Sequence, residues 1–208
     1  MENNRILQKG ECVIRNSFWN RYIDLVKNSV IPYQWDILND RREDAEPSRA
    51  IDNLRIAAGE MEGHFYGQVF QDSDVYKWLE AVGNILMLER DEELEKQADS
   101  VIDLIAKAQE EDGYLDTYFS IEEPDKKWTD VLECHELYCA GHFIESAVAY
   151  YRATGKEKII QVAYKLADYL DTVFGPEEGK LHGYPGHQEI EIALIKLYDL
   201  SGNEKYLK

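Results

Sequence analysis

Two histidines and a cysteine lie in the segment HELYCAGH, residues 135–142, among leucine, tyrosine, alanine and glycine. A helix turns by about 100° per residue, so His135, Cys139 and His142 would share one narrow stripe of a helix here. Imidazole and thiolate groups on one stripe can bind a metal, form part of an active site, or find partners within a core. The distances along this helix and the other polar residues of the sequence help to decide between these three uses.

A metal site on this stripe is disfavoured by distance. His135 and His142 would be separated by about 10 Å of helix rise, whereas ligand bonds to zinc are about 2 Å long. We therefore interpret Cys139 as a core residue. Cys12, Cys134 and Cys139 cannot all pair with one another, and we expect free thiols, as in a reducing compartment.

Several other polar residues lie at or near the starts of two expected helices, at about 132–153 and 187–200, or in the loop before the second. Imidazole, carboxylate and phenol groups there could bond ligand hydroxyls in a pocket. A lone buried histidine is more often structural, but several that converge on one end of a protein favour a site. The residues are His135, His142, His182, His187, Glu136, Glu189 and Tyr184.

The composition indicates a globular protein. Of the 208 residues, 44% are hydrophobic and 12% are aromatic, which is enough for a substantial core. The net charge is −18 and no basic cluster occurs, which argues against nucleic acid and anionic membranes as partners. Because the sequence shows neither an apolar span of membrane length nor a leader, we expect a soluble, cytoplasmic protein.

Helical periodicity dominates from Asp74 onward, without the sustained alternation of polar and apolar residues that predicts strands. The helices at about 132–153 and 187–200 are apolar around much of their circumference, so we expect neighbours to enclose them. A helix at 156–174 has one apolar face and should cover them. Earlier helices are expected at 72–89 and 92–110.

A short internal repeat joins an enclosed helix to a covering one. The segments AYYRATGKEKII (149–160) and KLYDLSGNEKYL (196–207) share an apolar helix end, Thr or Ser, Gly, and Glu-Lys before an apolar pair. Short turns at one end and long loops at the other are typical of an α/α toroid or an α-solenoid. Since the second copy ends one turn into its covering helix, we infer the N-terminal piece of a longer protein.

The N-terminal segment, residues 1–58, has a less regular pattern. It is expected to hold a short strand in GECVIRNSFW (10–19) and then an amphipathic helix in SFWNRYIDLVKNSVI (17–31), which Pro32 would end. The residues from there to Arg55 have the composition of a loop. Residues 59–208 would form the helical domain.

The sequence resembles glycoside hydrolase family 127, the β-L-arabinofuranosidase-like family, from about Phe18 to the last residue. The resemblance lies in the ordered segments VIPYQWDILND, VFQDSDVYKWLEA, AQEEDGYLDT, HELYCAGHFIESAVAYYRATG, FGPEEGKLHG and GHQEIEIALIKLYDLSG. It implies an all-α fold in which this chain is the first half of an (α/α)6 barrel of helical hairpins, truncated at its C-terminus. β-Sandwich domains would follow the barrel.

The resemblance also implies roles for particular residues. His135 of the HE-x-Y motif and His187 of the GH-x-E-I-E motif would contact the sugar, with Phe70 as a wall of the pocket. His142, two turns deeper, would be structural. The family resembles retaining glycosidases with a zinc-bound cysteine nucleophile and a glutamate acid/base, all of which would lie beyond Lys208. This chain alone would then contain no catalytic residue and no metal ligand, bind no zinc and be inactive.

The leading hypothesis is thus part of a glycosidase that acts on a small carbohydrate, a terminal β-L-arabinofuranoside or a related pentoside. Two other functions stay open. An α-solenoid scaffold could bind a partner helix or peptide on its concave face. Toroids also support other carbohydrate chemistries, such as those of epimerases and unsaturated-glycuronide hydrolases.

Overall fold

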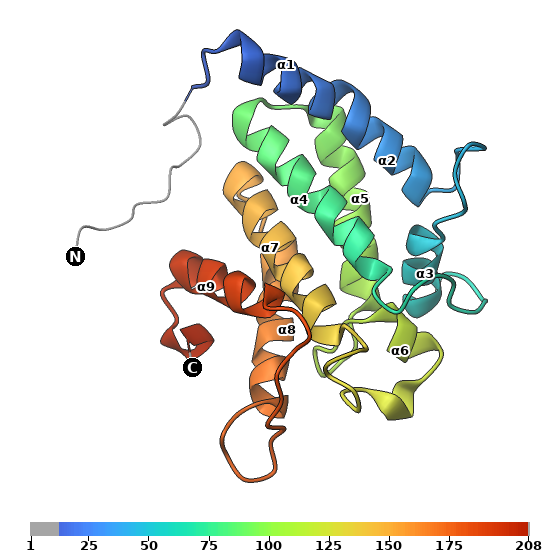
Figure 1. Cartoon of the computed structure of the whole chain (residues 1–208), viewed down its shortest axis with the longest axis vertical. Coiled ribbons are helices and arrows are strands. Elements are labelled where there is room, and N and C mark those ends of the chain that lie inside the picture. The colour runs from blue at the N-terminus through green and yellow to red at the C-terminus, as the bar shows by residue number, and fades with distance from the viewer. Residues whose placement is uncertain (1–12, 208) are drawn as a thin grey trace.

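The computed structural model describes residues 13–207, which form helices and loops without a strand, apart from one isolated β-bridge between Phe174 and Leu181 (Figure 1). The all-α prediction is confirmed for this part of the chain. The long helices are α4 (Asp72–Leu88), α5 (Glu92–Ala108), α7 (Glu136–Thr154), α8 (Glu157–Val173) and α9 (Glu189–Ser201). The short ones are α1 (Ser17–Leu25), α2 (Ile31–Leu38), α3 (Ala50–Ala57) and α6 (Thr117–Ile121).

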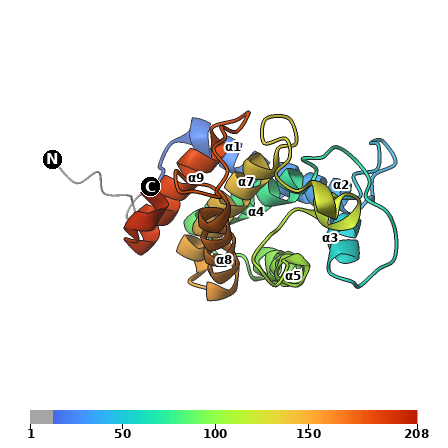
Figure 2. The same ribbon diagram turned by 90° about the horizontal axis from the view of Figure 1, so that it is seen from below.

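The long helices form two layers. α4, α7 and α9 lie in one layer, and α5 and α8 lie in the other (Figure 2). α7 packs between α4 and α9 and is buried around most of its circumference, as predicted for an enclosed helix. α8 buries one apolar face, which runs from Ile159 to Leu170, as predicted for a covering helix. α9 differs from the prediction, because only Ile190, Ala193 and Leu197 are fully buried, while Ile192 and Ile195 are exposed.

Short links and long loops lie at opposite ends of the hairpins, as the repeat predicts. Asp91 caps α5 almost directly after α4, and Gly155 ends α7 in the left-handed conformation, with φ 73°. The long loops before α7 and before α9 lie together at the other end (Figure 1). The starts of α7 and α9 therefore face the same end of the fold.

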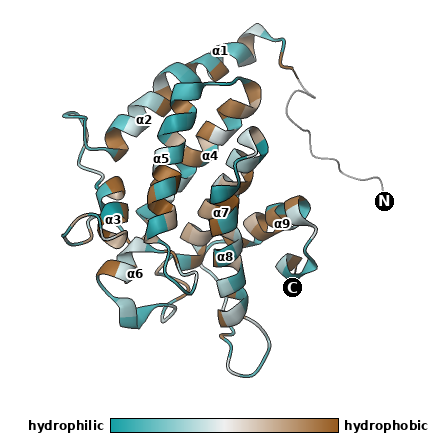
Figure 3. Ribbon diagram, turned by 180° about the vertical axis from the view of Figure 1, so that it is seen from behind, coloured by the Kyte–Doolittle hydropathy of each residue, from teal (hydrophilic) through white to brown (hydrophobic). Residues whose placement is uncertain are grey.

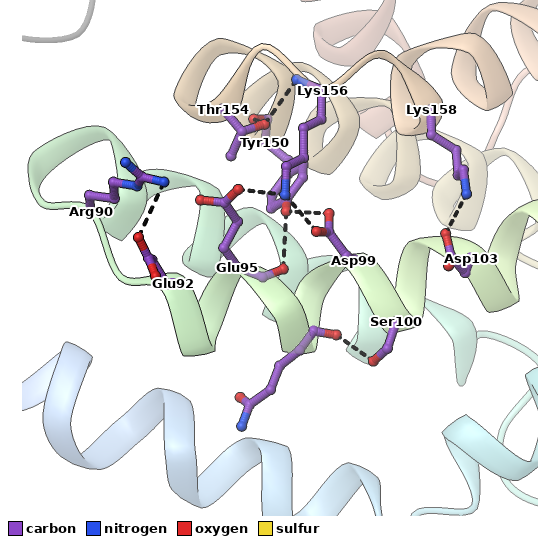
Figure 4. A network of polar contacts seen from close by, with 11 residues as sticks. Arg90, Glu92, Glu95, Asp99, Ser100, Asp103, Tyr150, Thr154, Lys156 and Lys158 are labelled. Atoms are coloured by element: carbon purple, nitrogen blue, oxygen red, sulfur yellow. Dashed lines mark hydrogen bonds and ion pairs between the residues drawn. The ribbon is translucent and has the colours of Figure 1, made fainter.

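A polar network ties the two layers together (Figure 4). The Lys156 ammonium group, just before α8, contacts the carboxylates of Glu95 and Asp99 on α5. Tyr150 of α7 donates a hydrogen bond of 2.8 Å to Asp99, and Lys158 pairs with Asp103 at 2.6 Å. Exposed ion pairs contribute little energy each, so this network mainly fixes the register of α5 against α7 and α8.

Two glycines let helices of the inner layer approach closely. A Cβ atom on Gly83 of α4 would lie 2.8 Å from the backbone nitrogen of Tyr150 in α7. A Cβ atom on Gly141 of α7 would lie 2.8 Å from the backbone carbon of Glu189 in α9. Contacts this short with backbone cannot be relieved by side-chain motion, so the spacing of α4, α7 and α9 requires glycine at both positions.

The N-terminal predictions are partly wrong. Pro32 does not end the helix, because a π-helical turn at Val26–Val30 precedes it and the chain continues directly into α2. Ile31 donates its N–H to the carbonyl of Val26, five residues back. This wider turn places Pro32 in the first turn of the next α-helical segment, where a missing N–H removes no bond. Trp35 of α2 then stacks on Trp78, with ring centroids 4.6 Å apart.

The expected strand and loop also need correction. Residues 13–16 are not in a strand and 17–19 belong to α1, while residues 10–12 lie outside the described part. α3 replaces part of the predicted loop, because tertiary contacts outweigh its polar composition. Its Asn53 side chain pairs with the backbone N–H and carbonyl of Tyr66, at 3.0 and 2.8 Å.

Of the three cysteines, Cys134 and Cys139 are free thiols. Cys12 lies outside the described residues. Among the helices of residues 13–207, none is both long enough and apolar enough to cross a membrane.

Candidate functional site

α7 begins at Glu136 instead of residue 132, because His135 adopts the left-handed conformation, with φ 60°. This conformation is unfavourable for a residue with a Cβ atom and is common at functional sites. The ring is held in place by its Nδ1 atom, which lies 2.5 Å from the carbonyl oxygen of Glu133. Since a carbonyl only accepts, Nδ1 carries a proton, and in the neutral ring Nε2 then presents a lone pair.

Glu136 anchors the other side of this turn in the core. Its carboxylate accepts hydrogen bonds from the Tyr114 hydroxyl at 2.7 Å and from the Trp128 backbone N–H at 2.8 Å. Burial raises the pKa of Glu136 to about 7. Glu136 therefore holds the long loop against α7, and its side chain is buried, contrary to the expectation that it lines an open pocket.

The start of α9 lies against α7 at the same end of the fold. Gly141 allows the first turn of α9 to touch α7 directly. Gly186, just before this turn, lies so close to the Leu132 carbonyl oxygen that a Cβ atom would be 2.3 Å from it. These two close approaches bring His187 to His135, with their Nε2 atoms 3.1 Å apart. The two histidines that the resemblance assigns to sugar binding are thus neighbours.

Two aromatic rings complete this group. Phe70, just before α4, lies with its ring centroid 5.1 Å from that of His135. Tyr138, one turn into α7, contacts His135, His187 and His142, with centroid distances of 5.7, 5.0 and 4.5 Å. His135, His187 and Phe70 therefore form one cluster with Tyr138, which we call the histidine–aromatic cluster. It is open to solvent, because His187 and Phe70 are exposed and His135 is only half-buried.

This cluster offers hydrogen-bonding nitrogen atoms beside aromatic rings. The Nε2 lone pair of His135 can accept from the Nε2–H of His187, and both atoms can turn to ligand hydroxyls instead. Aromatic rings beside them can cover the apolar face of a sugar ring. No group in the cluster is a carboxylate or a thiol, so the groups that it offers to a ligand are imidazoles, a phenol and an aromatic ring.

A buried polar group lies under the cluster, between α7 and α9. His142 Nδ1 lies 3.2 Å from Glu189 Oε1, although the two atoms are not aligned for a hydrogen bond. Burial, followed by the nearby charge of Lys77, lowers the pKa of His142 to about 4. His142 is thus neutral near pH 7, so its contact with Glu189 is not an ion pair. This position fits the predicted structural role of His142.

Glu189 continues this group toward Glu145 and Lys196. Burial and a hydrogen bond with Glu145 raise the pKa of Glu189 to about 8. The pKa of Glu145 is lowered despite its burial, because Glu189 donates to it and the Lys196 ammonium contacts it. The proton therefore resides on Glu189, and the negative charge resides on Glu145 beside Lys196.

Glu80, His142 and Glu145 offer three possible metal-ligand atoms, all within 4.8 Å of one another. The Lys196 ammonium already contacts Glu145 and lies 3.9 Å from Glu80. A cation from the chain itself thus neutralises Glu145 and lies at ion-pair distance from Glu80. Among residues 13–207 this is the only such group, and it contains no cysteine, so the described residues do not fit a cysteine-bound zinc ion.

The remaining residues suggested by the sequence lie outside the cluster. His182 is exposed in the loop before α9, and Tyr184 is 90% exposed. Tyr138 was missed, although it occupies the stripe between His135 and His142 at helical spacing. A tyrosine in an apolar helix is normally expected to be a core residue. Only the close approach of α9 to α7 shows that Tyr138 lies among three histidines.

Comparisons with known proteins identify the family of the chain. Residues 12–208 match the family described as "Beta-L-arabinofuranosidase, GH127 catalytic domain". The chain is 47% identical to a non-reducing end β-L-arabinofuranosidase of Bifidobacterium longum subsp. longum, over 93% of this chain and 32% of that protein. Among solved structures, a GH127 β-L-arabinofuranosidase from Geobacillus stearothermophilus T6 is 62% identical, with a TM-score of 0.92.

That alignment covers 94% of this chain and 31% of the Geobacillus chain. Another solved GH127 β-arabinofuranosidase is 33% identical, with a TM-score of 0.85, over 94% of this chain and 31% of that one. The chain thus spans about a third of the length of these relatives. With a match over nearly all of its residues, the chain belongs to the GH127 β-L-arabinofuranosidase family.

Proposed function

We propose that this chain supplies the sugar-binding side of the pocket in a retaining glycoside hydrolase that acts on terminal β-L-arabinofuranosides or related pentosides. The observation that carries the proposal is the 3.1 Å approach of His135 and His187 beside Phe70. These side chains come from three separate elements, and they present nitrogen atoms and an aromatic face to solvent. A small polyol needs such a combination.

The two-layer arrangement of helices supports a place in the first half of an (α/α)6 barrel. α4, α7 and α9 would be inner helices, and α5 and α8 would be outer helices. In this proposal residues 1–58 remain a separate N-terminal segment and 59–208 belong to the barrel. The cysteine nucleophile, its zinc and the acid/base glutamate would be supplied from outside this chain. A cytoplasmic location stays a prediction.

Membership of a glycosidase family favours this function over an α-solenoid scaffold or another toroid enzyme. The fold alone could not separate these, because helical toroids carry many activities. The histidine–aromatic cluster adds a reason of its own, since a peptide-binding scaffold has no need for a pair of imidazoles held at the surface by a strained backbone.

The proposal can be tested in a chimera. This chain would replace the matching 31% of the Geobacillus stearothermophilus protein, and hydrolysis of an aryl β-L-arabinofuranoside would be measured. His135→Ala and His187→Ala should each lower kcat/KM by about ten- to a hundredfold, because each leaves a ligand hydroxyl unpaired at roughly 1–3 kcal/mol. His182→Ala, an exposed histidine of the same loop, should have no effect. Unchanged kcat/KM in both cluster variants would refute the assignment.

A further inference from the structure

The first turn of α9 carries a carboxyl group that is wedged into α7. Glu189 follows His187 by two residues, and its side chain is largely buried, with 15% of its surface exposed. A Cβ atom on Gly141 would lie 2.8 Å from Glu189 Cγ. The Glu189 carboxyl group then lies between His142, at 3.2 Å, and Glu145, to which it is hydrogen-bonded.

We propose that Glu189 is a positioning residue for His187: its carboxyl group, lodged between His142 and Glu145, holds the first turn of α9 against α7 and keeps His187 beside His135. Position along the helix makes this coupling direct. Only Gln188 separates the two residues, so a shift of the Glu189 side chain out of α7 moves the His187 backbone with it. Naming the histidine pair as a sugar subsite is the one part that rests on the proposed function.

The groups that face Glu189 make this contact depend on its proton. α7 presents neutral His142 and ionised Glu145, and α4 presents Glu80, while the charge of Lys77 on α4 acts on His142. α9 itself contributes Lys196, whose single charge is already paired with Glu145. Protonated Glu189 donates to Glu145, whereas ionised Glu189 would repel both Glu145 and Glu80. The site is thus built to hold one proton between two glutamates.

The sign of the pH effect follows from the pKa of Glu189, which is raised to about 8. Below this pH the carboxyl group keeps its proton and the first turn of α9 stays in contact with α7. Above it, like charges oppose each other in a buried place, and the turn should separate from α7. The histidine pair should therefore come apart as the pH rises through about 8.

Nuclear magnetic resonance of the 208-residue chain with labelled histidine rings tests this directly. Ring ¹⁵N shifts report the tautomer and pairing of His135 and His187, and single His→Gln variants assign them. The titration would run from about pH 7.5 to 9.5, above the ordinary imidazole range. The wild-type paired signals should be lost together with ionisation of Glu189, which is followed through its ¹³Cδ shift.

Three variants sharpen the test. Glu189→Gln keeps a donor for Glu145 without a charge, so its histidine pair should survive to about pH 9.5. Glu189→Ala should lose the pair at every pH. Glu191→Gln is the matched control, because Glu191 is an exposed glutamate in the same helical turn. It should behave like the wild type.

A purely structural role for Glu189 would give different results. If Glu189→Ala lowers the melting temperature but keeps the paired signals, or if wild-type pairing persists after Glu189 ionises, the positioning role is refuted. Titration with L-arabinose separates this from the proposed function. If the histidine pair changes with Glu189 but none of the proteins binds sugar, only the sugar subsite is refuted. If sugar binding is lost in His135→Ala but is unchanged in the Glu189 variants, only the positioning role is refuted.

Discussion

The Nε2 atoms of His135 and His187 lie 3.1 Å apart, although 52 positions separate the two residues in the chain. Two local features make this approach possible. His135 is turned out of the helix by its left-handed backbone, and α9 can lie directly on α7 because Gly141 has no side chain. The pairing is therefore a property of backbone geometry as much as of the imidazoles themselves.

Gly141→Ala should separate the histidine pair. Its Cβ atom would be 2.8 Å from the backbone of Glu189, so α9 must move away from α7 by a few tenths of an ångström or more. Sugar binding should weaken on the order of tenfold, and the paired ¹⁵N signals should change. Gly183→Ala is the control, because its nearest neighbour would be at 3.8 Å. Equal binding by the two variants would contradict the prediction.

The sequence predicts the helices of this fold better than it predicts the contacts between them. α4, α5, α7, α8 and α9 carry strong helical periodicity, and their bounds agree with prediction to within a few residues. The prediction that Pro32 ends a helix was wrong because a π-helical turn depends on the register of the backbone hydrogen bonds, which composition does not show. α3 was missed because it is held by distant partners, such as Tyr66 for Asn53.

The candidate site, like the fold, could be predicted from the sequence only in part. A family resemblance can assign His135, His187 and Phe70 together, but no spacing rule relates residues on three elements. Glu136 was misread because it adjoins His135 in the sequence, while the left-handed turn between them points the two side chains in different directions. The roles of Tyr138 and Glu189 depend on how closely α9 approaches α7, which only the folded chain reveals.

His142→Ala and His135→Ala should have opposite effects. His142 is largely buried between Glu189 and Tyr138, so its loss leaves a cavity and should lower the melting temperature by several degrees. His135 is only half-buried and lies in the open histidine–aromatic cluster, so its loss should reduce sugar binding with a smaller change in stability. Thermal unfolding and sugar titration of both variants would check this. Loss of binding in His142→Ala at unchanged stability, with His135→Ala silent, would reverse the assignment.

The stability of the chain should fall as the pH rises from about 4.5 to about 7. Burial raises the pKa of Glu136 from 4.5 to about 7 and that of Asp72 from 3.8 to about 6. The folded state thus holds these protons more tightly than the unfolded state. Their stabilising effect is complete below the unfolded pKa values and is lost as the pH rises through the folded ones.

Urea unfolding at a series of pH values measures this effect, and Glu136→Gln should reduce the slope between about pH 4.5 and 7 because it removes one of the titrating groups. Glu133→Gln is the matched control, since Glu133 is an exposed glutamate in the same loop. A midpoint that rises with pH over this interval in the wild type would show that other groups dominate.

The isolated 208-residue chain should self-associate through α9. Ile192 and Ile195 are 51% and 53% exposed on this helix, which carries hydrophobic residues along its length (Figure 3). Adjacent exposed apolar side chains favour contact with another copy. The Ile192→Lys/Ile195→Lys double variant should be monomeric at concentrations where the wild type sediments as larger species. Leu88→Lys, at the end of α4, should not have this effect. A monomeric wild type would refute the prediction.

The wild-type chain should retain no stoichiometric zinc after dialysis, because the Lys196 ammonium already occupies the space beside the carboxylates of Glu145 and Glu80. Lys196→Met should change this. It removes the cation and keeps the apolar stem, so two glutamates and the neutral imidazole of His142 become available within 4.8 Å of one another. Elemental analysis should then find zinc that approaches one ion per chain in Lys196→Met, and none in Lys158→Met, where the lost ammonium pairs only with Asp103 on the surface.

One zinc ion in the wild type would mean that the group is a native metal site and that the metal displaces the Lys196 ammonium. The absence of zinc from both variants would mean that Glu189, still protonated beside Glu145, keeps the site closed without the help of Lys196.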